Sequence, residues 1–135
     1  MKRTPPELQD FAERYTAAWC SQDAARVGAF FSRTGSLSVN DGPPAVGRRA
    51  IEDTVQSFMT AFPDLRVILD KLVVRDDCVE YHWTLTGTNR GPGGTGKAVR
   101  VSGMENWRLW EDGLIAVSEG EFDAANYRRQ LGIES

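Results

Sequence analysis

The hydrophobic pattern changes its period about halfway along the 135-residue chain, from a helical spacing of three and four residues to a spacing of two. The first helical segment follows a start signature in which Thr4 caps the helix, Pro5 takes its first position and Glu7 completes a capping box. Apolar residues then recur at helical spacing over residues 8–19. These features predict an amphipathic N-terminal helix.

Two more helices and one strand are predicted before the period changes. Asp23 is placed to cap a short helix that ends at Gly35, and the alternating residues 36–40 predict a strand. Helical spacing returns over residues 49–61. Pro63 ends this third helix, because proline cannot continue the backbone hydrogen bonds.

Alternating apolar and polar residues predict four consecutive strands in the second half of the chain. They cover residues 65–75, 78–90, 97–111 and 114–122, and short turn-forming segments join them as hairpins. A last helix over residues 124–131 ends at Gly132. Helices early and strands late predict one α+β domain over residues 1–135, with a single antiparallel sheet packed on one face by helices.

Charge and cysteine content exclude several classes of protein. Sixteen Lys and Arg against 19 Asp and Glu give a net charge of -3, so a nucleic-acid partner is not expected. Cys20 and Cys78 fit no metal-binding spacing and the chain has one histidine, so we expect no metal. The sequence shows neither a membrane-spanning apolar stretch nor a signal peptide, which predicts a cytoplasmic protein without a membrane partner.

The glycine-rich residues 91–97 match two nucleotide-binding patterns but lack the surroundings that those patterns need. A phosphate-binding loop requires Ser or Thr after its lysine and a helix that begins there. Here Ala98 follows Lys97 and opens a predicted strand. We therefore expect a hairpin loop that binds no nucleotide.

Glu105 is the most informative single residue. Counting by twos along its predicted strand places it on the same face as Val101, Trp107 and Leu109, so a carboxyl group points among inward apolar residues. Burial raises the pKa of such a group unless a partner compensates. Three interpretations of this residue remain: an ion pair with Arg66 or Arg100, a functional role in a pocket, and exposure to solvent through an irregularity of the strand.

Several stretches resemble the SnoaL-like polyketide cyclase family, within the nuclear-transport-factor-2-like superfamily. They are residues 79–89, 99–109 and 111–115, the pair Phe122-Asp123, and residues 130–132. The resemblance implies a cystatin-like α+β roll, in which a cone-shaped, curved antiparallel sheet packs against the N-terminal helices around a deep apolar pocket. It also implies an acid–base role for Asp123. We expect a small hydrophobic molecule to bind in this pocket, against Trp19, Phe58, Phe62, His82 and Trp107.

Residues 13–15, 39–41 and 105–109 also resemble ketosteroid isomerase, another member of that superfamily. This resemblance implies that Tyr15 is the oxyanion-binding tyrosine and Asp41 the general base. Glu105 then takes the place of the protonated carboxylic acid.

Each of these side chains also has a purely structural interpretation. Tyr15 lies on the apolar face of the first helix, where a tyrosine packs its ring in the core. Asp41 precedes a Gly-Pro-Pro turn, and Asp123 is placed to cap the last helix. His82 faces away from Tyr81, so it lies either at a contact of the sheet or in a pocket.

Two functions from different classes follow. The first is a cofactor-independent acid–base enzyme, of isomerase or cyclase type, acting on a small carbonyl compound. In the isomerase version Asp41 is the base and Tyr15 and protonated Glu105 hold the enolate oxygen. In the cyclase version Asp123 transfers the proton. The alternative is a non-catalytic small-molecule-binding or dimerisation module.

A homodimer is expected as well. Trp83, Trp107 and Trp110 lie on the predicted sheet, which then carries more apolar surface than the helices can cover. One face of the sheet would therefore meet its copy in a second chain.

Overall fold

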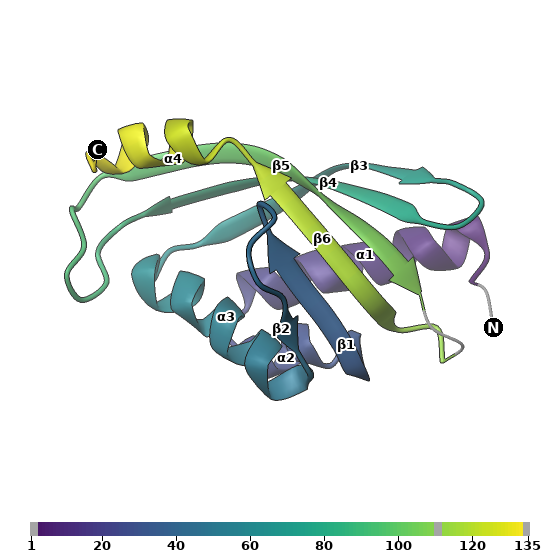
Figure 1. Ribbon diagram of the computed structural model, residues 1–135. Helices are drawn as coiled ribbons and strands as arrows, with labels where there is room; N and C mark the ends of the chain where they lie inside the picture. The colour runs from purple at the N-terminus through teal and green to yellow at the C-terminus, as the bar shows by residue number, and fades with distance from the viewer. Residues whose placement is uncertain (1–2, 110–111, 134–135) are drawn as a thin grey trace.

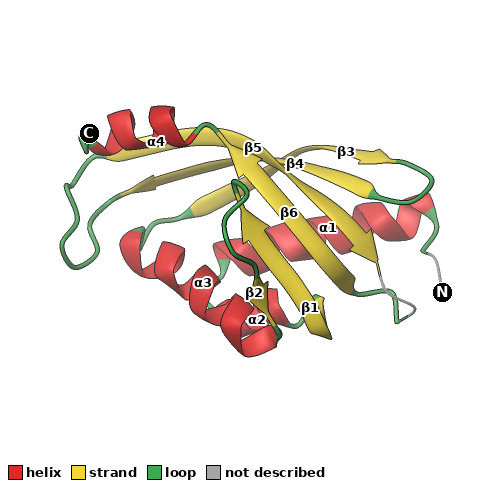
Figure 2. Cartoon of the chain, viewed as in Figure 1, coloured by secondary structure: helices red, strands yellow, loops and turns green. Residues whose placement is uncertain are grey.

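The computed structural model describes residues 3–109 and 112–133, with helices mainly in the first half and strands mainly in the second (Figures 1 and 2). The elements are α1 (Pro5–Cys20), α2 (Ala24–Gly28), β1 (Phe31–Val39), β2 (Ala45–Val46), α3 (Arg48–Ala61), β3 (Arg66–Val74), β4 (Val79–Thr88), β5 (Ala98–Leu109), β6 (Ile115–Phe122) and α4 (Ala124–Leu131). The four predicted strands of the second half are confirmed. Residues 110 and 111, at the end of the third of them, lie outside the described residues.

The predicted helix ends are confirmed by their caps. The Thr4 hydroxyl accepts a hydrogen bond from the Glu7 backbone N–H, and the Glu7 carboxylate accepts one from the Thr4 N–H, which completes the capping box. Asp123 caps α4 in the same way, by accepting from the Asn126 N–H. At the other end of α4, Gly132 has a φ of 78°, a left-handed conformation that glycine adopts without strain.

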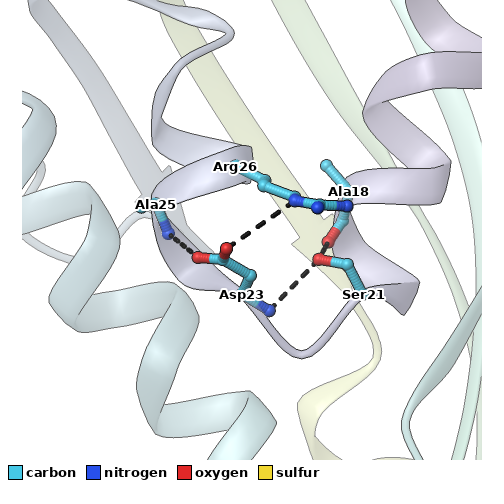
Figure 3. Close-up of polar contacts among 5 residues, drawn as sticks. All are labelled: Ala18, Ser21, Asp23, Ala25 and Arg26. Carbon is cyan, nitrogen blue, oxygen red and sulfur yellow. Dashed lines mark hydrogen bonds and ion pairs between the residues drawn. The ribbon is translucent and has the colours of Figure 1, made fainter.

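The turn between α1 and α2 is closed by side chains that satisfy free backbone groups (Figure 3). The Ser21 hydroxyl donates to the Ala18 carbonyl at 2.6 Å and accepts from the Asp23 N–H at 3.1 Å. The Asp23 carboxylate then accepts from the Ala25 N–H and pairs with Arg26. These contacts reverse the chain so that α2 packs against α3.

The predicted second helix is longer than the observed one. The residues that follow the observed helix, from Phe31, belong to strand β1 of the sheet. The helix α2 ends at Gly28, and Phe31 already begins β1, whereas the sequence predicts helix up to Gly35 and strand only over residues 36–40. A short apolar run fits a helix and a buried strand equally well. Phe31 pairs with Ile115 of β6, in a parallel arrangement. The sheet is therefore not wholly antiparallel, and its order is β2-β1-β6-β5-β4-β3.

The sheet is strongly curved, and α1 and α3 lie on its concave side (Figure 1). Its pairing register shifts within β3, between Leu69 and Lys71, and within β5, between Arg108 and Leu109. Such irregularities increase the local twist of a strand and help a sheet to curve. The fold is therefore the expected α+β roll, with the helices filling one side of a curved sheet.

Two groups of buried residues form the core, and they meet beneath the curve of the sheet. The larger one joins α1, α2 and α3 to β1, β4, β5 and β6, and the smaller one joins Phe62 and Leu65 to the inner faces of β3, β4 and β5. Trp19 and Trp83 pack against both groups and are themselves only partly buried. The boundary between the two groups is consequently the place where a pocket can open.

The tryptophans expected to form a homodimer surface do not lie on the outer face of the sheet, as far as the structure describes them. Trp107 is completely buried and Trp83 faces the concave side, so neither adds apolar surface to the outer face of the sheet. Trp110 lies outside the described residues. The outer face of β4 instead carries Glu80 and His82, which pair with each other. Homodimerisation stays a prediction, without these tryptophans as its support.

The glycine-rich loop between β4 and β5 is a hairpin connection, as predicted. The Asn89 side chain accepts a hydrogen bond from the Thr95 N–H, and the Asn89 carbonyl accepts one from Gly96. Gly93 and Gly96 both have a φ of 76°, a conformation that favours glycine. The strand β5 follows at Ala98, so no helix N-terminus faces this loop.

Candidate functional site

A pocket opens between the two core groups, on the concave side of the sheet. The space that its lining atoms leave empty is about 700 Å³, which includes the open mouth. Six of its lining residues are aromatic, and among the described residues no lysine, arginine or histidine lines it. The lining residues are Trp19, Leu37, Val39, Thr54, Phe58, Val67, Tyr81, Trp83, Leu85, Val101, Glu105, Gly120, Glu121, Phe122 and Tyr127. Such a lining favours an apolar ligand that carries no negative charge.

Glu105 brings a carboxyl group to this apolar pocket. It is 8% exposed and lines the pocket, and its neighbours at alternate positions of β5, Val101 and Trp107, are buried on the same side. The inward orientation predicted from the period of two is confirmed. No salt bridge joins Glu105 to Arg66 or Arg100 in the described structure, and both arginines are exposed. The ion-pair interpretation is therefore wrong.

Three neutral donors hold one oxygen of the Glu105 carboxyl group. Oε1 accepts hydrogen bonds from the Tyr15 hydroxyl at 2.9 Å, the Trp107 indole Nε1 at 3.0 Å and the Ser118 hydroxyl at 2.7 Å. No described residue donates a hydrogen bond to Oε2. Because Glu105 lines the pocket, Oε2 is the oxygen left for a ligand.

Burial governs the protonation of this group of residues. Loss of hydration raises the pKa of Glu105 above its ordinary value of 4.5, and the three hydrogen bonds oppose the rise without cancelling it. Burial and the nearby Glu105 carboxyl group raise the pKa of Tyr15 well above its ordinary range, so Tyr15 stays a neutral donor. Since Oε1 already accepts three hydrogen bonds, Oε2 is the oxygen left to carry a proton on Glu105.

Stacked aromatic rings fix the position of these donors. Tyr15 makes edge-to-face contacts with Trp107 and Tyr81, at centroid distances of 5.1 and 5.3 Å. Tyr81 stacks on Trp107 with a centroid distance of 4.8 Å, and a hydrogen bond of 2.5 Å joins the Tyr81 and Thr16 hydroxyls. Close packing of this kind restricts side-chain motion. The Glu105 carboxyl group is thus held by a rigid frame contributed by α1, β4, β5 and β6.

The residues expected to line the pocket divide into two groups. Trp19 and Phe58 do line it. Phe62 is completely buried in the smaller core group, and Trp107 lies behind Glu105 as its hydrogen-bond donor. His82 is on the opposite face of the sheet, 3.2 Å from a Glu80 oxygen, because its strand position has the other parity. Phe62, Trp107 and His82 are therefore not among the lining residues, and their role in ligand binding stays a prediction that this placement does not favour.

The two predicted catalytic aspartates lie outside the pocket lining. Asp41 is exposed, with a φ of 60°, in the turn that follows β1. Asp123 is exposed and caps α4. The turn and cap interpretations are confirmed for both residues. A direct role of either carboxylate in catalysis stays a prediction that this geometry does not favour.

Sequence reasoning missed two residues beside Glu105. Ser118 donates the shortest of the three hydrogen bonds, and Gly120, the cross-strand partner of Glu105, lines the pocket. A Cβ atom on Gly120 would lie 3.6 Å from the Glu105 Cγ, so this glycine is next to the side chain of Glu105. Alternation along residues 115–122 puts Ser118 and Gly120 on one face. Only the pairing register with β5 shows that this face meets Glu105.

Two features of other protein classes are not found in the described part of the chain. No group of three or more His, Cys, Asp or Glu residues is arranged there to hold a metal ion. Residues 3–109 and 112–133 also contain no helix with the length and apolar character that a bilayer crossing requires.

The chain belongs to the SnoaL-like domain family, whose profile it matches over residues 12–118. This confirms the resemblance carried by the motifs of the second half. A search of curated proteins found no match. The family and the fold are thus established by sequence profile and structure, whereas the reaction is not.

Solved structures of the same fold cover almost the whole chain. TsrD from Streptomyces laurentii is 24% identical with a TM-score of 0.84, over 98% of this chain and 99% of that one. A protein with a ketosteroid isomerase-like fold from Catenulispora acidiphila, solved with trimethylamine, is 17% identical with a TM-score of 0.82, over 98% and 96%. A putative SnoaL-like polyketide cyclase from Jannaschia is 19% identical with a TM-score of 0.79, over 100% and 99%. At these identities the likeness shows the fold alone.

Proposed function

We propose that this protein catalyses acid–base chemistry, without a cofactor, on a small and mostly apolar carbonyl compound that binds in the pocket. The observation that carries the proposal is the Glu105 carboxyl group, which lines an apolar pocket and has one oxygen held by three neutral donors and the other without a donor among the described residues. A carboxylic acid kept neutral in this way donates a hydrogen bond to a developing oxyanion.

In the proposed reaction Glu105 acts on the carbonyl oxygen of the ligand. The Oε2–H group donates a hydrogen bond to that oxygen, and the bond strengthens as a proton leaves the neighbouring carbon and negative charge moves to the oxygen. The apolar lining excludes water, which increases the effect of the donor. In an isomerisation the freed proton then returns to another carbon. In a cyclisation the enolate carbon attacks a second carbonyl of the same molecule, the π bond of that carbonyl breaks, and its oxygen takes the freed proton.

Asp41 is the base in this proposal. It follows Val39, which lines the pocket, by two residues, although Asp41 itself is exposed. Asp123, at the end of β6, is the corresponding candidate in the cyclase version. Tyr15 acts through Glu105, since its hydroxyl is already donated to Oε1.

A second candidate function is a binding module with the same pocket and no turnover. The observation that favours it is that Glu105 is the only buried carboxyl group in the described lining, while Asp41 and Asp123 lie outside it. The Catenulispora protein was solved with a small molecule, trimethylamine, which supports small-ligand binding by this fold. The Jannaschia protein is a putative SnoaL-like polyketide cyclase, which supports the first candidate, an enzyme.

Exchange of the α-protons of 1-tetralone in deuterated water, followed by NMR, tests both candidates without knowledge of the natural substrate. We expect the protein to accelerate exchange and to bind 1-tetralone more tightly than tetralin, which lacks the carbonyl. Glu105→Leu should slow exchange by about 100-fold, and Glu105→Gln by less, because an amide still donates. Asp41→Asn should slow exchange without weakening binding.

The matched control is Glu80→Gln, which changes a carboxylate on the opposite face of the neighbouring strand. It should leave exchange and binding unchanged. Binding of 1-tetralone with no exchange above the uncatalysed rate would reject the enzyme and favour the binding module. Equal binding of 1-tetralone and tetralin would reject the role of Glu105 as hydrogen-bond donor.

A further inference from the structure

Ser118 is a completely buried hydroxyl that the proposed reaction does not use directly. It lies on β6 opposite Trp107, has 0% exposure, and donates to Glu105 Oε1 at 2.7 Å. A buried hydroxyl costs free energy unless it is hydrogen-bonded. An alanine at this position would need no hydrogen-bond partner. The presence of a hydroxyl there therefore suggests that its hydrogen bond to Glu105 has a role.

The three donors to Glu105 come from three different elements and converge on a single oxygen. Tyr15 comes from α1, Trp107 from β5 and Ser118 from β6. If these donors served only to bury a carboxyl group, they would satisfy its two oxygens more evenly. Instead Oε1 accepts three hydrogen bonds, and Oε2 receives none from the described residues.

No charge near the carboxyl group can take over this role. The titratable groups that face it are the Tyr15 and Tyr81 hydroxyls, both of which burial keeps neutral by raising their pKa. Glu121 lines the pocket but is exposed, and no basic residue lines it among those described. The orientation of Glu105 therefore depends on neutral hydrogen bonds, which also oppose the rise in its pKa that burial causes.

We propose that Ser118 is a positioning residue, whose hydroxyl holds Glu105 Oε1 so that Oε2 alone carries the proton and meets the ligand. The contact between Oε2 and a ligand rests on the proposed function. The hold of Ser118 on Oε1 does not, because it is a property of the free protein. Ser118 is the informative donor to change, since removal of Tyr15 or Trp107 would also remove a large buried ring.

The first test is Ser118→Ala, read through the ¹³C NMR titration of the Glu105 carboxyl carbon. The Ser118 hydrogen bond favours the ionised carboxylate and lowers the pKa of Glu105. Its loss should therefore raise this pKa further, by about one unit. Ser118→Thr, which keeps a hydroxyl, should restore the wild-type titration.

A matched control is Ser32→Ala, which removes another buried serine hydroxyl from the sheet. Ser32 is 4% exposed and donates to Asp112, outside the Glu105 hydrogen bonds. It should leave the titration of Glu105 where it is. The proposal is overturned if Ser118→Ala leaves the pKa of Glu105 unchanged, or if Ser32→Ala shifts it equally.

A second variant keeps the test valid if Ser118→Ala does not fold. In Glu105→Gln the carbonyl Oε1 should keep the three donors, which directs the side-chain NH₂ to the pocket. Nuclear Overhauser contacts of that NH₂ with pocket-lining side chains are expected. Contacts with the Trp107 Nε1–H and the Ser118 side chain instead would overturn the assignment of Oε2.

The 1-tetralone exchange assay separates this inference from the proposed function. Ser118→Ala should lower the exchange rate at saturating 1-tetralone while the affinity for 1-tetralone changes little. If the wild-type protein catalyses no exchange but Ser118→Ala still raises the pKa of Glu105, the positioning role stands and the catalytic proposal fails.

Discussion

Two glutamates on neighbouring strands show opposite ways of holding a carboxyl group. Glu105 on β5 faces the concave side, where its Oε1 accepts hydrogen bonds from three neutral donors. Glu80 on β4 faces the outer side, where one oxygen lies 2.6 Å from the Arg75 Nε and the other 3.2 Å from the His82 Nε2. Burial raises the pKa of Glu105, whereas Arg75 and His82 lower the pKa of Glu80.

The difference shows that the partners and the access of water, not the residue type, determine the charge of a carboxyl group. Both glutamates are well hydrogen-bonded. Glu80 has a cationic partner and solvent contact, which favour its ionised form. Glu105 has neither, and neutral donors offset only part of its loss of hydration. The surroundings of Glu80 therefore favour its ionised form, while those of Glu105 favour its neutral form.

Removal of each carboxyl group should have very unequal effects on stability. Glu105→Ala leaves three buried donors without an acceptor and opens a cavity, so we expect a loss of roughly 3 to 5 kcal/mol in the free energy of unfolding. Glu80→Ala breaks only a solvent-screened pair and should cost a small fraction of that. Urea denaturation at neutral pH measures both, with Glu105→Gln as the variant that keeps an acceptor. Equal losses at the two positions would contradict the comparison.

The two glutamates should also give stability opposite dependences on pH. The pKa of Glu105 is raised in the folded state, so its contribution is full below the unfolded pKa and is lost as the pH rises through the folded pKa. The pKa of Glu80 is lowered, so its contribution is present above the unfolded pKa and is lost as the pH falls through the folded pKa.

Urea midpoints measured between about pH 3 and pH 8 test these signs. Relative to wild type, Glu105→Gln should gain stability as the pH rises, because it no longer loses a proton. Glu80→Gln should be relatively most stable at the acid end. Curves that run parallel to wild type for both variants would show that neither carboxyl group titrates as described.

The sequence alone placed Glu105 on the correct face but did not reveal what holds it. Alternation along β5 is a local property of the strand, so the inward direction of Glu105 could be predicted from its neighbours. Its contact with Ser118 depends on the register between β5 and β6, which shifts between Arg108 and Leu109. Pairing between strands is a tertiary property that no local pattern encodes.

The same distinction explains the other errors. Helix caps at Thr4 and Asp123 were predicted because a cap is made by residues a few positions apart. The parallel pairing of β1 with β6 joins segments far apart in the chain, so the helical spacing around Phe31 was misleading. Whether Asp41 reaches the pocket depends on the path of a turn, which the resemblance to ketosteroid isomerase could not fix.

The smallest expected effect tests the outer pair alone. Arg75→Gln removes the cation that most strongly lowers the pKa of Glu80 and leaves the weaker contact with His82. The pKa of Glu80 should rise toward its ordinary value, and stability should fall less than in Glu80→Ala, because the contact between Glu80 and His82 remains. At about 1 M salt, where the screening length falls to roughly 3 Å, this difference from wild type should shrink further.

The loss caused by Glu105→Ala should not shrink at high salt, because it comes from buried neutral donors rather than from exposed charges. Urea denaturation of the three proteins at low and high salt measures both effects, and a salt-sensitive loss in Glu105→Ala would mean that the inner carboxyl group is also held by charge.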